Sequence, residues 1–476
     1  MDYSQFFLMI PEVTLFLSFL VFLFCDFFLR GKNKRKVMQI LVYPFFVVLL
    51  ASCFLSKPTE LFGGMYMVSS ACIVMKIILA FVLFIVLIIS PKWLEEKSIR
   101  NKAGEYYELL IMTLLGLYSM LSSGHFLFFF LGLELATIPM ACLIAIDRFE
   151  RHSAEAAAKF ILLAIFSGAV MLYGISFIYA ACGTMYFDDI SKRITDSPMS
   201  IMGMVFFFSG LGFKISLVPF HLWTADTYQG APTPITAYMS IASKGAAAFA
   251  LIVFLIRIFF PLVFYWEWLL TITVTLSITI ANLTALRQKE LKRFMAFSSI
   301  SQAGYIMLAT CSAREAGIVA LEYYVLVYAV ANLVVFTIIH EIEFHRGDTL
   351  IYSYEGLYQT NPKLSFLLTL ALFSLAGIPP FAGMFSKFFV FMASVRTGEP
   401  VAYILLFIAL INTVISLYYY LMIVKAMYIT PSEHPLPTFR TSWNIRLALA
   451  LCTIGVVCFG FCSFFYEWIA EGVKGI

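Results

Sequence analysis

Apolar runs of membrane-spanning length follow one another along almost the whole chain, and only short polar stretches separate them. Hydrophobic residues make up 62% of the 476 residues and charged residues only 13%, whereas a soluble domain has about 45–50% apolar and 25% charged residues. A helix needs about 20 apolar residues to cross the hydrocarbon core of a bilayer. The sequence therefore predicts an all-α polytopic membrane protein and excludes a soluble enzyme.

Fourteen of these runs are expected to form transmembrane helices. In chain order they cover residues 6–29, 37–55, 66–90, 105–123, 125–146, 154–181, 200–222, 233–258, 262–286, 295–311, 316–340, 364–395, 401–428 and 445–468. The polar stretches between them are too short to fold into a soluble domain. One of them, from Phe187 to Ile194, predicts a short amphipathic segment on the outer surface.

Basic residues concentrate in alternate loops. The first, third, fifth and ninth loops contain Arg30, Lys32, Lys34, Arg35, Lys36, Lys92, Lys97, Arg100, Lys102, Arg148, Arg151, Arg287, Lys289, Lys292 and Arg293, whereas the even-numbered loops hold only Lys57, Lys192, Arg193, Arg257, Arg314 and Arg396. Loops rich in lysine and arginine stay in the cytoplasm. The odd-numbered loops are therefore predicted to be cytoplasmic, and both chain termini are predicted to lie on the outer side.

Prolines interrupt the seventh helix at Pro219 and the twelfth at Pro379 and Pro380. In lipid, the backbone groups that proline frees must face protein or water. Broken helices in matching positions of two halves are typical of a transport site between inverted repeats, although a kink that serves packing alone is an alternative. Because the breaks are five helices apart, we expect two five-helix repeats of opposite topology. The expected parts are a three-helix segment at 1–104, helices 4–8 at 105–258, helices 9–13 at 259–428, and helix 14 at 429–476.

Charged side chains lie inside five of the central spans: Glu134, Lys159, Lys214, Lys244 and Lys387. Each charge at mid-membrane costs about 2.5–3.5 kcal/mol on insertion scales, so a chain that keeps several is expected to move charge. A free lysine has a pKa of about 10.4, and burial can lower that value by about 3–5 units, to where the group both takes up and releases a proton. We predict a proton relay through Glu134, Lys214, Lys244 and Lys387. Metal-ion binding fits less well, because an ammonium group offers no lone pair.

Other interpretations stay open for individual residues. Glu134 and Lys214 could form a static buried ion pair, and Lys159 could extend its ammonium group to the membrane interface. His221 beside the first break titrates near neutrality, which suits a secondary relay role, but a histidine bonded to the end of a helix is the alternative. Lys76 in the third helix stands apart from the set, and its role is open.

The sequence also excludes several kinds of site. The nine cysteines form no C-x-x-C pair, which argues against an iron–sulfur or zinc site. His340 and His345 resemble a zincin helix, but they are five residues apart instead of four. Neither a Walker loop nor G-x-G-x-x-G is present, so no nucleotide site is expected. Together these features predict that the chain binds no metal, nucleotide or redox cofactor. The formal net charge of +4 is small, and no nucleic-acid partner is expected.

Several segments resemble the antiporter-like membrane subunits of respiratory complex I, the NADH–quinone oxidoreductase. They are residues 211–234, which include Lys214, Pro219 and His221, together with Gly132-Leu-Glu134, Ala242-Ser-Lys244, 286–293, 298–305 and 376–387. Within that family, Tyr228-Gln-Gly230 before Ala-Pro232 and the chain length resemble the N-type subunits. The L type is longer and has an added lateral helix, and the M type has a glutamate at the position of Lys387.

The resemblance implies a proton-pumping subunit with Glu134, Lys214, Lys244 and Lys387 in the proton path and Lys159 less central. It implies NADH, FMN, iron–sulfur clusters and quinone on other subunits, and the other membrane subunits and the lipid bilayer as partners. The presence of the first three helices favours a bacterial inner membrane, with a plastid thylakoid membrane as the alternative. A stand-alone or Mrp-type cation/proton antiporter is the alternative function, because broken helices and buried lysines alone fit both.

Overall fold

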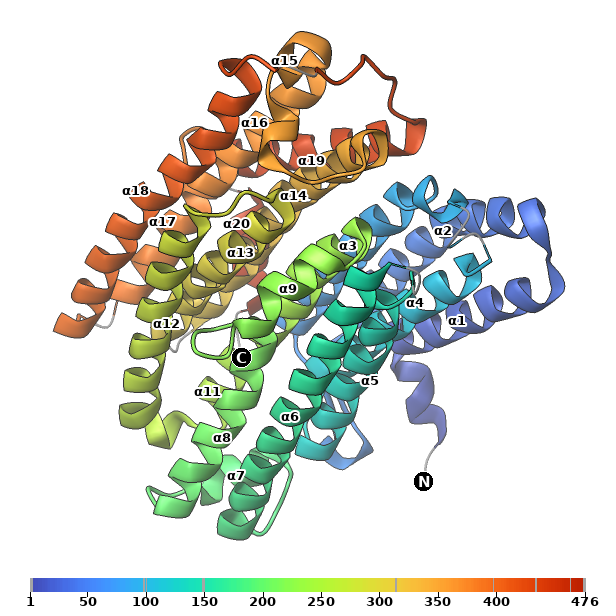
Figure 1. Ribbon diagram of the computed structural model, residues 1–476. Helices are drawn as coiled ribbons and strands as arrows, with labels where there is room; N and C mark the ends of the chain where they lie inside the picture. The colour runs from blue at the N-terminus through green and yellow to red at the C-terminus, as the bar shows by residue number, and fades with distance from the viewer. Residues whose placement is uncertain are drawn as a thin grey trace. The chain divides into compact units, whose positions relative to one another are not determined.

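The computed structural model describes residues 3–96, 99, 101–147, 150–312, 315–396, 398–432, 435–462 and 464–473. Four basic residues of the orientation argument, Lys97, Arg100, Arg148 and Arg314, lie outside these described residues. Most of the described chain is helical (Figure 1). The chain divides into two compact units, of which residues 1–215, 242–269 and 471–476 form the first, and residues 216–241 and 270–470 form the second.

The first unit consists mainly of long apolar helices. They are α1 (Ile10–Phe28), α2 (Gly31–Leu55), α3 (Ser70–Ile89), α4 (Ala103–Leu121), α5 (Phe126–Ile144), α6 (Arg151–Cys182), α7 (Phe187–Arg193), α8 (Pro198–Ile215) and α11 (Lys244–Arg257). A short antiparallel ribbon of β1 (Thr59–Leu61) and β2 (Tyr66–Val68) joins α2 to α3. The predicted amphipathic segment forms a short helix, α7, which buries Phe187 and Ile190; its place on the outer surface stays a prediction.

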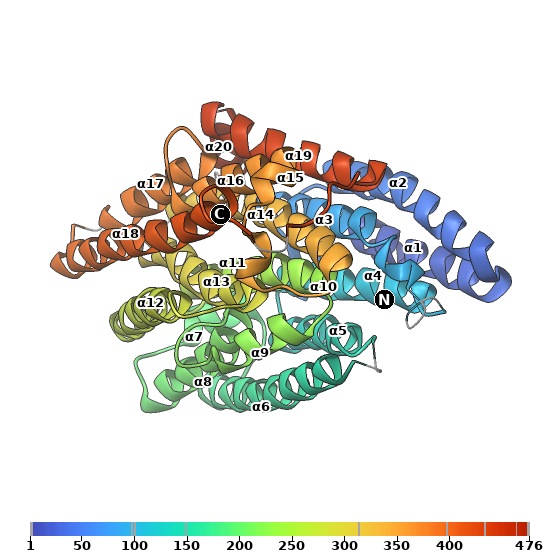
Figure 2. The ribbon, with the colours of Figure 1, turned by 45° about the horizontal axis from the view of Figure 1, so that its top comes forward.

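Small residues let the helices of the first unit approach one another closely. A β-carbon on Gly116 of α4 would lie 2.3 Å from the backbone nitrogen of Ala136, and one on Gly132 of α5 would lie 2.5 Å from that of Met120. The helices α6 and α8 also run side by side (Figure 2). Because lipid tails are as apolar as the side chains, close van der Waals packing of this kind is a main source of helix association in membranes.

A buried ion pair connects the N-terminal helices. The Lys76 ammonium group of α3 donates to the Glu12 carboxylate of α1 at 2.6 Å, and the two side chains are 0% and 5% exposed. Tyr66 and Ser122 also donate to this carboxylate, at 3.0 and 3.1 Å. Lys76, whose role the sequence leaves open, is thus part of a well-bonded pair between α1 and α3.

Replacing Lys76 by methionine is expected to destabilise the first unit by about 3–5 kcal/mol, because Glu12 would keep a buried charge without its cation. The double variant Lys76→Met/Glu12→Gln should recover most of this loss, since it leaves no unpaired charge. Thermal unfolding of the detergent-solubilised protein measures both variants. An equal loss of stability in the single and double variants would contradict this electrostatic explanation.

The second unit is built around one long helix, α14 (Glu315–Arg346), which contacts α10, α13, α16, α17 and α19. Its other helices are α9 (Leu222–Gly230), α10 (Thr233–Tyr238), α13 (Leu291–Leu308), α15 (Leu357–Thr360), α16 (Pro362–Ala376), α17 (Ala382–Val395), α18 (Pro400–Tyr428), α19 (Trp443–Phe461), most of α12 (Val263–Ala285) and most of α20 (Phe464–Val473). In the most apolar stretch of α14, 94% of the residues are buried inside the protein.

Twelve helical stretches of the described chain are long and apolar enough to cross a membrane, and the shorter helices α16 and α17 are also apolar. The fourth predicted span forms the 19-residue helix α4, which is less apolar and carries Glu105 and Glu108. The polytopic helical fold is therefore confirmed. The count of fourteen spans, the inverted repeats and the four-part division stay predictions.

Both predicted helix breaks are present and share a local design. The first separates α8 from α9, and the second separates α16 from α17. The residue that follows each first half has a left-handed backbone, with φ of 67° at Ser216 and 89° at Gly377, a conformation that ends a helix. In both cases a proline, Pro219 or Pro380, follows three residues later. The eighth predicted helix also contains a π-helical turn, Met239–Ser243, between α10 and α11, which the sequence did not predict.

Candidate functional site

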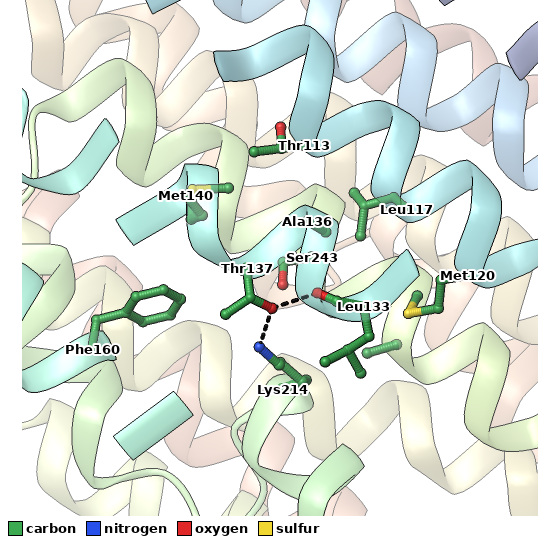
Figure 3. Close-up of a pocket in the computed structure, with 11 residues that line it drawn as sticks. Thr113, Leu117, Met120, Leu133, Ala136, Thr137, Met140, Phe160, Lys214 and Ser243 are labelled. Carbon is green, nitrogen blue, oxygen red and sulfur yellow. Dashed lines mark hydrogen bonds between the residues drawn. The ribbon is translucent and has the colours of Figure 1, made fainter. Parts of the chain in front are cut away.

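Lys214 lies near the end of α8, with only 6% of its surface exposed. Its ammonium group donates a hydrogen bond of 2.5 Å to the Thr137 hydroxyl of α5, and that hydroxyl donates to the Leu133 carbonyl at 2.6 Å (Figure 3). The rings of Phe160 and Phe213 lie 6.0 and 5.9 Å from the ammonium group, within the range of cation–π attraction. These contacts give Lys214 a set of uncharged partners.

A small cavity opens beside the Lys214 ammonium group. Side chains of α4, α5, α6, the π-helical turn Met239–Ser243 and α11 line it, among them Thr113, Met140 and Ser243 (Figure 3). The cavity has a volume of about 20 Å³, and a cavity needs about 10–15 Å³ to hold one water molecule. The site therefore has room for a water molecule that can pass a proton to or from Lys214.

Glu134 lies one helical turn before Thr137 on α5 and is half-buried. The sequence places Glu134 beside Lys214 as a candidate ion pair, yet these two described residues form no direct ion pair, because Lys214 reaches Thr137 instead. The Glu134 carboxylate lies against α6, where a β-carbon on Gly168 would be 2.9 Å from Oε1. The charges of Glu134 and Lys214 attract one another without direct contact. This arrangement suits tuning of Lys214 better than direct proton exchange.

Lys244 begins α11 directly after the π-helical turn, and it is 2% exposed. Ser243 before it and Ala247 one turn later both line the cavity beside Lys214. Single π-helical turns inside α-helices are frequent at functional sites. Glu134, Lys214 and Lys244 thus all lie in the first unit, on helices that enclose this cavity.

The two secondary candidates lie at more exposed positions. Lys159 of α6 forms an ion pair with Glu155 at 2.8 Å, one turn away on the same helix, and the two side chains are 44% and 55% exposed. Exposed pairs of this kind contribute about 0.3–0.5 kcal/mol. His221 belongs to the second unit, where it immediately precedes α9 and is partly buried. Neither position is as enclosed as those of Lys214, Lys244 and Lys387.

Lys387 occupies a second buried site, in the second unit, and is 4% exposed. Its ammonium group donates a hydrogen bond of 2.9 Å to the carbonyl of Ala376, the last residue of α16. The helix break leaves such carbonyl groups without helical partners, so it creates the acceptor that holds this lysine. The Tyr305 ring lies 5.0 Å from the ammonium group. A β-carbon on Gly377 would lie 3.0 Å from the Lys387 Cδ atom.

A network of neutral polar groups, which the sequence did not single out, borders the Lys387 cavity. Gln302 of α13 receives a hydrogen bond from the Tyr324 hydroxyl at 2.5 Å, and it donates to the Leu375 carbonyl at 3.2 Å and to the Tyr420 hydroxyl at 3.3 Å. This cavity has a volume of about 10 Å³, at the lower limit for holding one water molecule. Gln302 lies in the segment 298–305 that carried the family resemblance, which is the signal that could have identified it.

The sites of Lys214 and Lys387 share one chemical design. Each ammonium group is buried, donates to an uncharged oxygen and borders a cavity of about the size of a water molecule. Burial penalises the ammonium form and leaves the neutral amine unpenalised, so both forms are accessible to a lysine in such a site. The arrangement can therefore take up and release protons.

Comparisons with known proteins point in one direction. Residues 123–416 match the family described as NADH:quinone oxidoreductase/Mrp antiporter, transmembrane. The chain is 52% identical to NADH-quinone oxidoreductase subunit N of Phocaeicola vulgatus over 472 residues, 99% of each chain. Its fold matches a chain of respiratory complex I from Thermus thermophilus with a TM-score of 0.81 and 29% identity, covering 94% of this chain and 96% of that one. A chain of the Mrp complex from Dietzia shares the fold, with a TM-score of 0.85 and 17% identity over 99% and 97% of the two chains.

Proposed function

The chain belongs to the NADH:quinone oxidoreductase/Mrp antiporter transmembrane family, and from this premise we propose that it is the N-type, proton-translocating membrane subunit of an NADH–quinone oxidoreductase. The name of a relative that is 52% identical over 99% of both chains supports the subunit type. The observation that supports protons as the transported species is the Lys214 site. There a buried lysine donates to a neutral hydroxyl beside a cavity of about the size of a water molecule.

In the proposed translocation step, Lys214 is the group that gains and loses a proton. Thr137 accepts a hydrogen bond from the ammonium form and orients it. The Glu134 charge favours that form through space, so a change in the distance between Glu134 and Lys214 would load or unload the lysine. Lys244 and Lys387 are proposed as further carriers in the same series.

The redox chemistry is proposed to take place on other subunits of the complex. The chain shows no nucleotide-binding or C-x-x-C motif, so it would take part in the enzyme through coupling to neighbouring subunits and not through a redox cofactor of its own. The relatives support a multi-pass protein of a bacterial inner membrane. The basic odd-numbered loops support an orientation with both termini on the outer side, and a thylakoid membrane is the lesser alternative.

An Mrp-type or stand-alone cation/proton antiporter is the second candidate, and the shared fold of the Mrp chain favours it. Purification in mild detergent should separate the two functions. We expect the protein to co-purify with other subunits in a complex that oxidises NADH, and to show no sodium/proton exchange on its own after reconstitution. Recovery as a lone protein that exchanges sodium for protons would contradict the complex I assignment.

A further inference from the structure

Glu322 of α14 is a buried carboxyl group that belongs to neither lysine site. It is 0% exposed, and neither of its carboxyl oxygens has a hydrogen-bond partner among the described residues. Glu343, near the other end of the same helix, differs because Lys292 at 3.2 Å and Thr233 both hold it. The protein therefore encloses the Glu322 carboxyl group without offering it a hydrogen bond among the described residues.

The next residue along α14 shows which part of the neighbouring helix α17 lies level with Glu322. The Tyr323 ring packs against the Phe389 ring of α17, with 5.5 Å between the centroids. Phe389 lies two residues beyond Lys387, on the side away from the helix break. Glu322 thus lies level with the half of α17 that leads away from Lys387, which is the outer half in the proposed orientation.

Glu322 lies on a face of α14 that does not line the Lys387 cavity. Tyr324 and Tyr328 of α14 line that cavity. An α-helix turns by about 100° per residue, so Glu322 lies about 160° around the helix axis from Tyr324. Glu322 therefore occupies a different face of α14 from the residues around Lys387.

An unbonded carboxyl group in this position works against stability. Burying a neutral polar group without a hydrogen bond costs about 1–3 kcal/mol, and an unpaired carboxylate costs more. A leucine would avoid both costs. An ionisable residue that is kept inside a membrane protein at such a cost marks a functional site by default.

We propose that Glu322 is an additional proton-carrying residue of this subunit, a carboxylic acid in its resting form, on the outer side of Lys387. This inference rests on the proposed function. In the step it performs, the O–H bond of the acid breaks and the proton passes to a water molecule on the outer side. The carboxylate then takes up the next proton, which the Lys387 ammonium group releases as it becomes a neutral amine; because Glu322 does not face the Lys387 cavity, intervening water passes this proton on.

The test uses the whole complex reconstituted in phospholipid vesicles, with the rate of proton pumping during NADH oxidation as the readout. Glu322→Gln keeps the shape and removes the titratable group, so we expect pumping to fall by about 100-fold, the low end for loss of an acid–base group. Glu322→Leu should lose pumping to the same extent while its thermal stability is equal to or higher than that of the wild type. Glu322→Asp should restore part of the pumping.

Two control variants make the outcomes distinguishable. Glu315→Gln removes an exposed carboxylate from the start of the same helix and should pump as the wild type does. Normal pumping in Glu322→Gln, combined with a loss in Lys214→Met, would overturn the role of Glu322 and leave the proposed function standing. Normal pumping in both variants would overturn the proposed function as well. A loss of assembled complex in both Glu322→Gln and Glu322→Leu would show a structural role and also overturn the inference.

Discussion

Replacing Lys214 by methionine is expected to abolish proton transport through this subunit while the chain still folds. Methionine has a similar length but no titratable group, and Thr137 keeps its own hydrogen bond to the Leu133 carbonyl in the variant. Because Lys214 donates to a neutral hydroxyl and not to a carboxylate, its removal leaves no carboxylate that it had bound. The rate of proton pumping by the reconstituted complex should fall by about 100-fold or more, since loss of an acid–base group costs about 10²–10⁴-fold in rate.

Glu134→Gln is the matched comparison for this prediction. It removes a charge that influences Lys214 without touching it, so we expect slower pumping and not complete loss. Lys159→Met removes a lysine from an exposed ion pair and should have a smaller effect still. Equal losses in Lys214→Met and Glu134→Gln would mean that the two residues act as one unit. Wild-type pumping by an assembled Lys214→Met complex would contradict Lys214 as a carrier.

The helices and their two breaks follow from local features of the sequence. The apolar runs are long enough to cross a membrane, and Pro219 and Pro380 mark the positions where the helices stop. The π-helical turn Met239–Ser243 has no such signal, because neither glycine nor proline lies within it. The ribbon of β1 and β2 was also hidden, since it lies within the loop and first turn assigned to the third span.

The direct partners of the buried lysines depend on tertiary geometry and were not predictable. Glu134 and Thr137 lie on the same face of α5, one turn apart, and a small rotation or shift of α5 decides which of them reaches Lys214. The Ala376 carbonyl becomes available to Lys387 only because α16 ends there. Glu322 shows the same signal as Glu134, a carboxylate inside an apolar run, but it lies outside the short motifs on which the family resemblance was based.

The second helix break leads to an equally strong prediction, which concerns Gly383, where α17 crosses α16. A β-carbon on Gly383 would lie 1.6 Å from the Ser374 carbonyl oxygen and 2.5 Å from its carbon. Both atoms belong to a helix backbone, which cannot move aside as the end of a flexible side chain can. Gly383 also lines the cavity of Lys387, and its backbone N–H donates to the Ser374 hydroxyl at 3.2 Å. Any added side chain at this position must therefore push α17 away from α16.

We expect Gly383→Ala to destabilise the second unit by about 3 kcal/mol or more, the upper range for overpacking. Helix propensity acts in the opposite direction, but it favours alanine over glycine by only about 1 kcal/mol. The displacement should also break the hydrogen bond from Lys387 to Ala376, so the complex that does assemble should pump poorly. Yield of assembled complex, its thermal midpoint and its pumping measure these effects.

Gly472→Ala in α20 is the matched control, because the nearest atom to its β-carbon is 3.6 Å away, an ordinary van der Waals contact. It should be neutral or slightly stabilising, since only the helix propensity changes. If Gly383→Ala behaved like this control in stability and pumping, the close crossing of α16 and α17 could not be what holds Lys387 in place. If stability fell while pumping per assembled complex stayed normal, the crossing would serve the fold but not the lysine site.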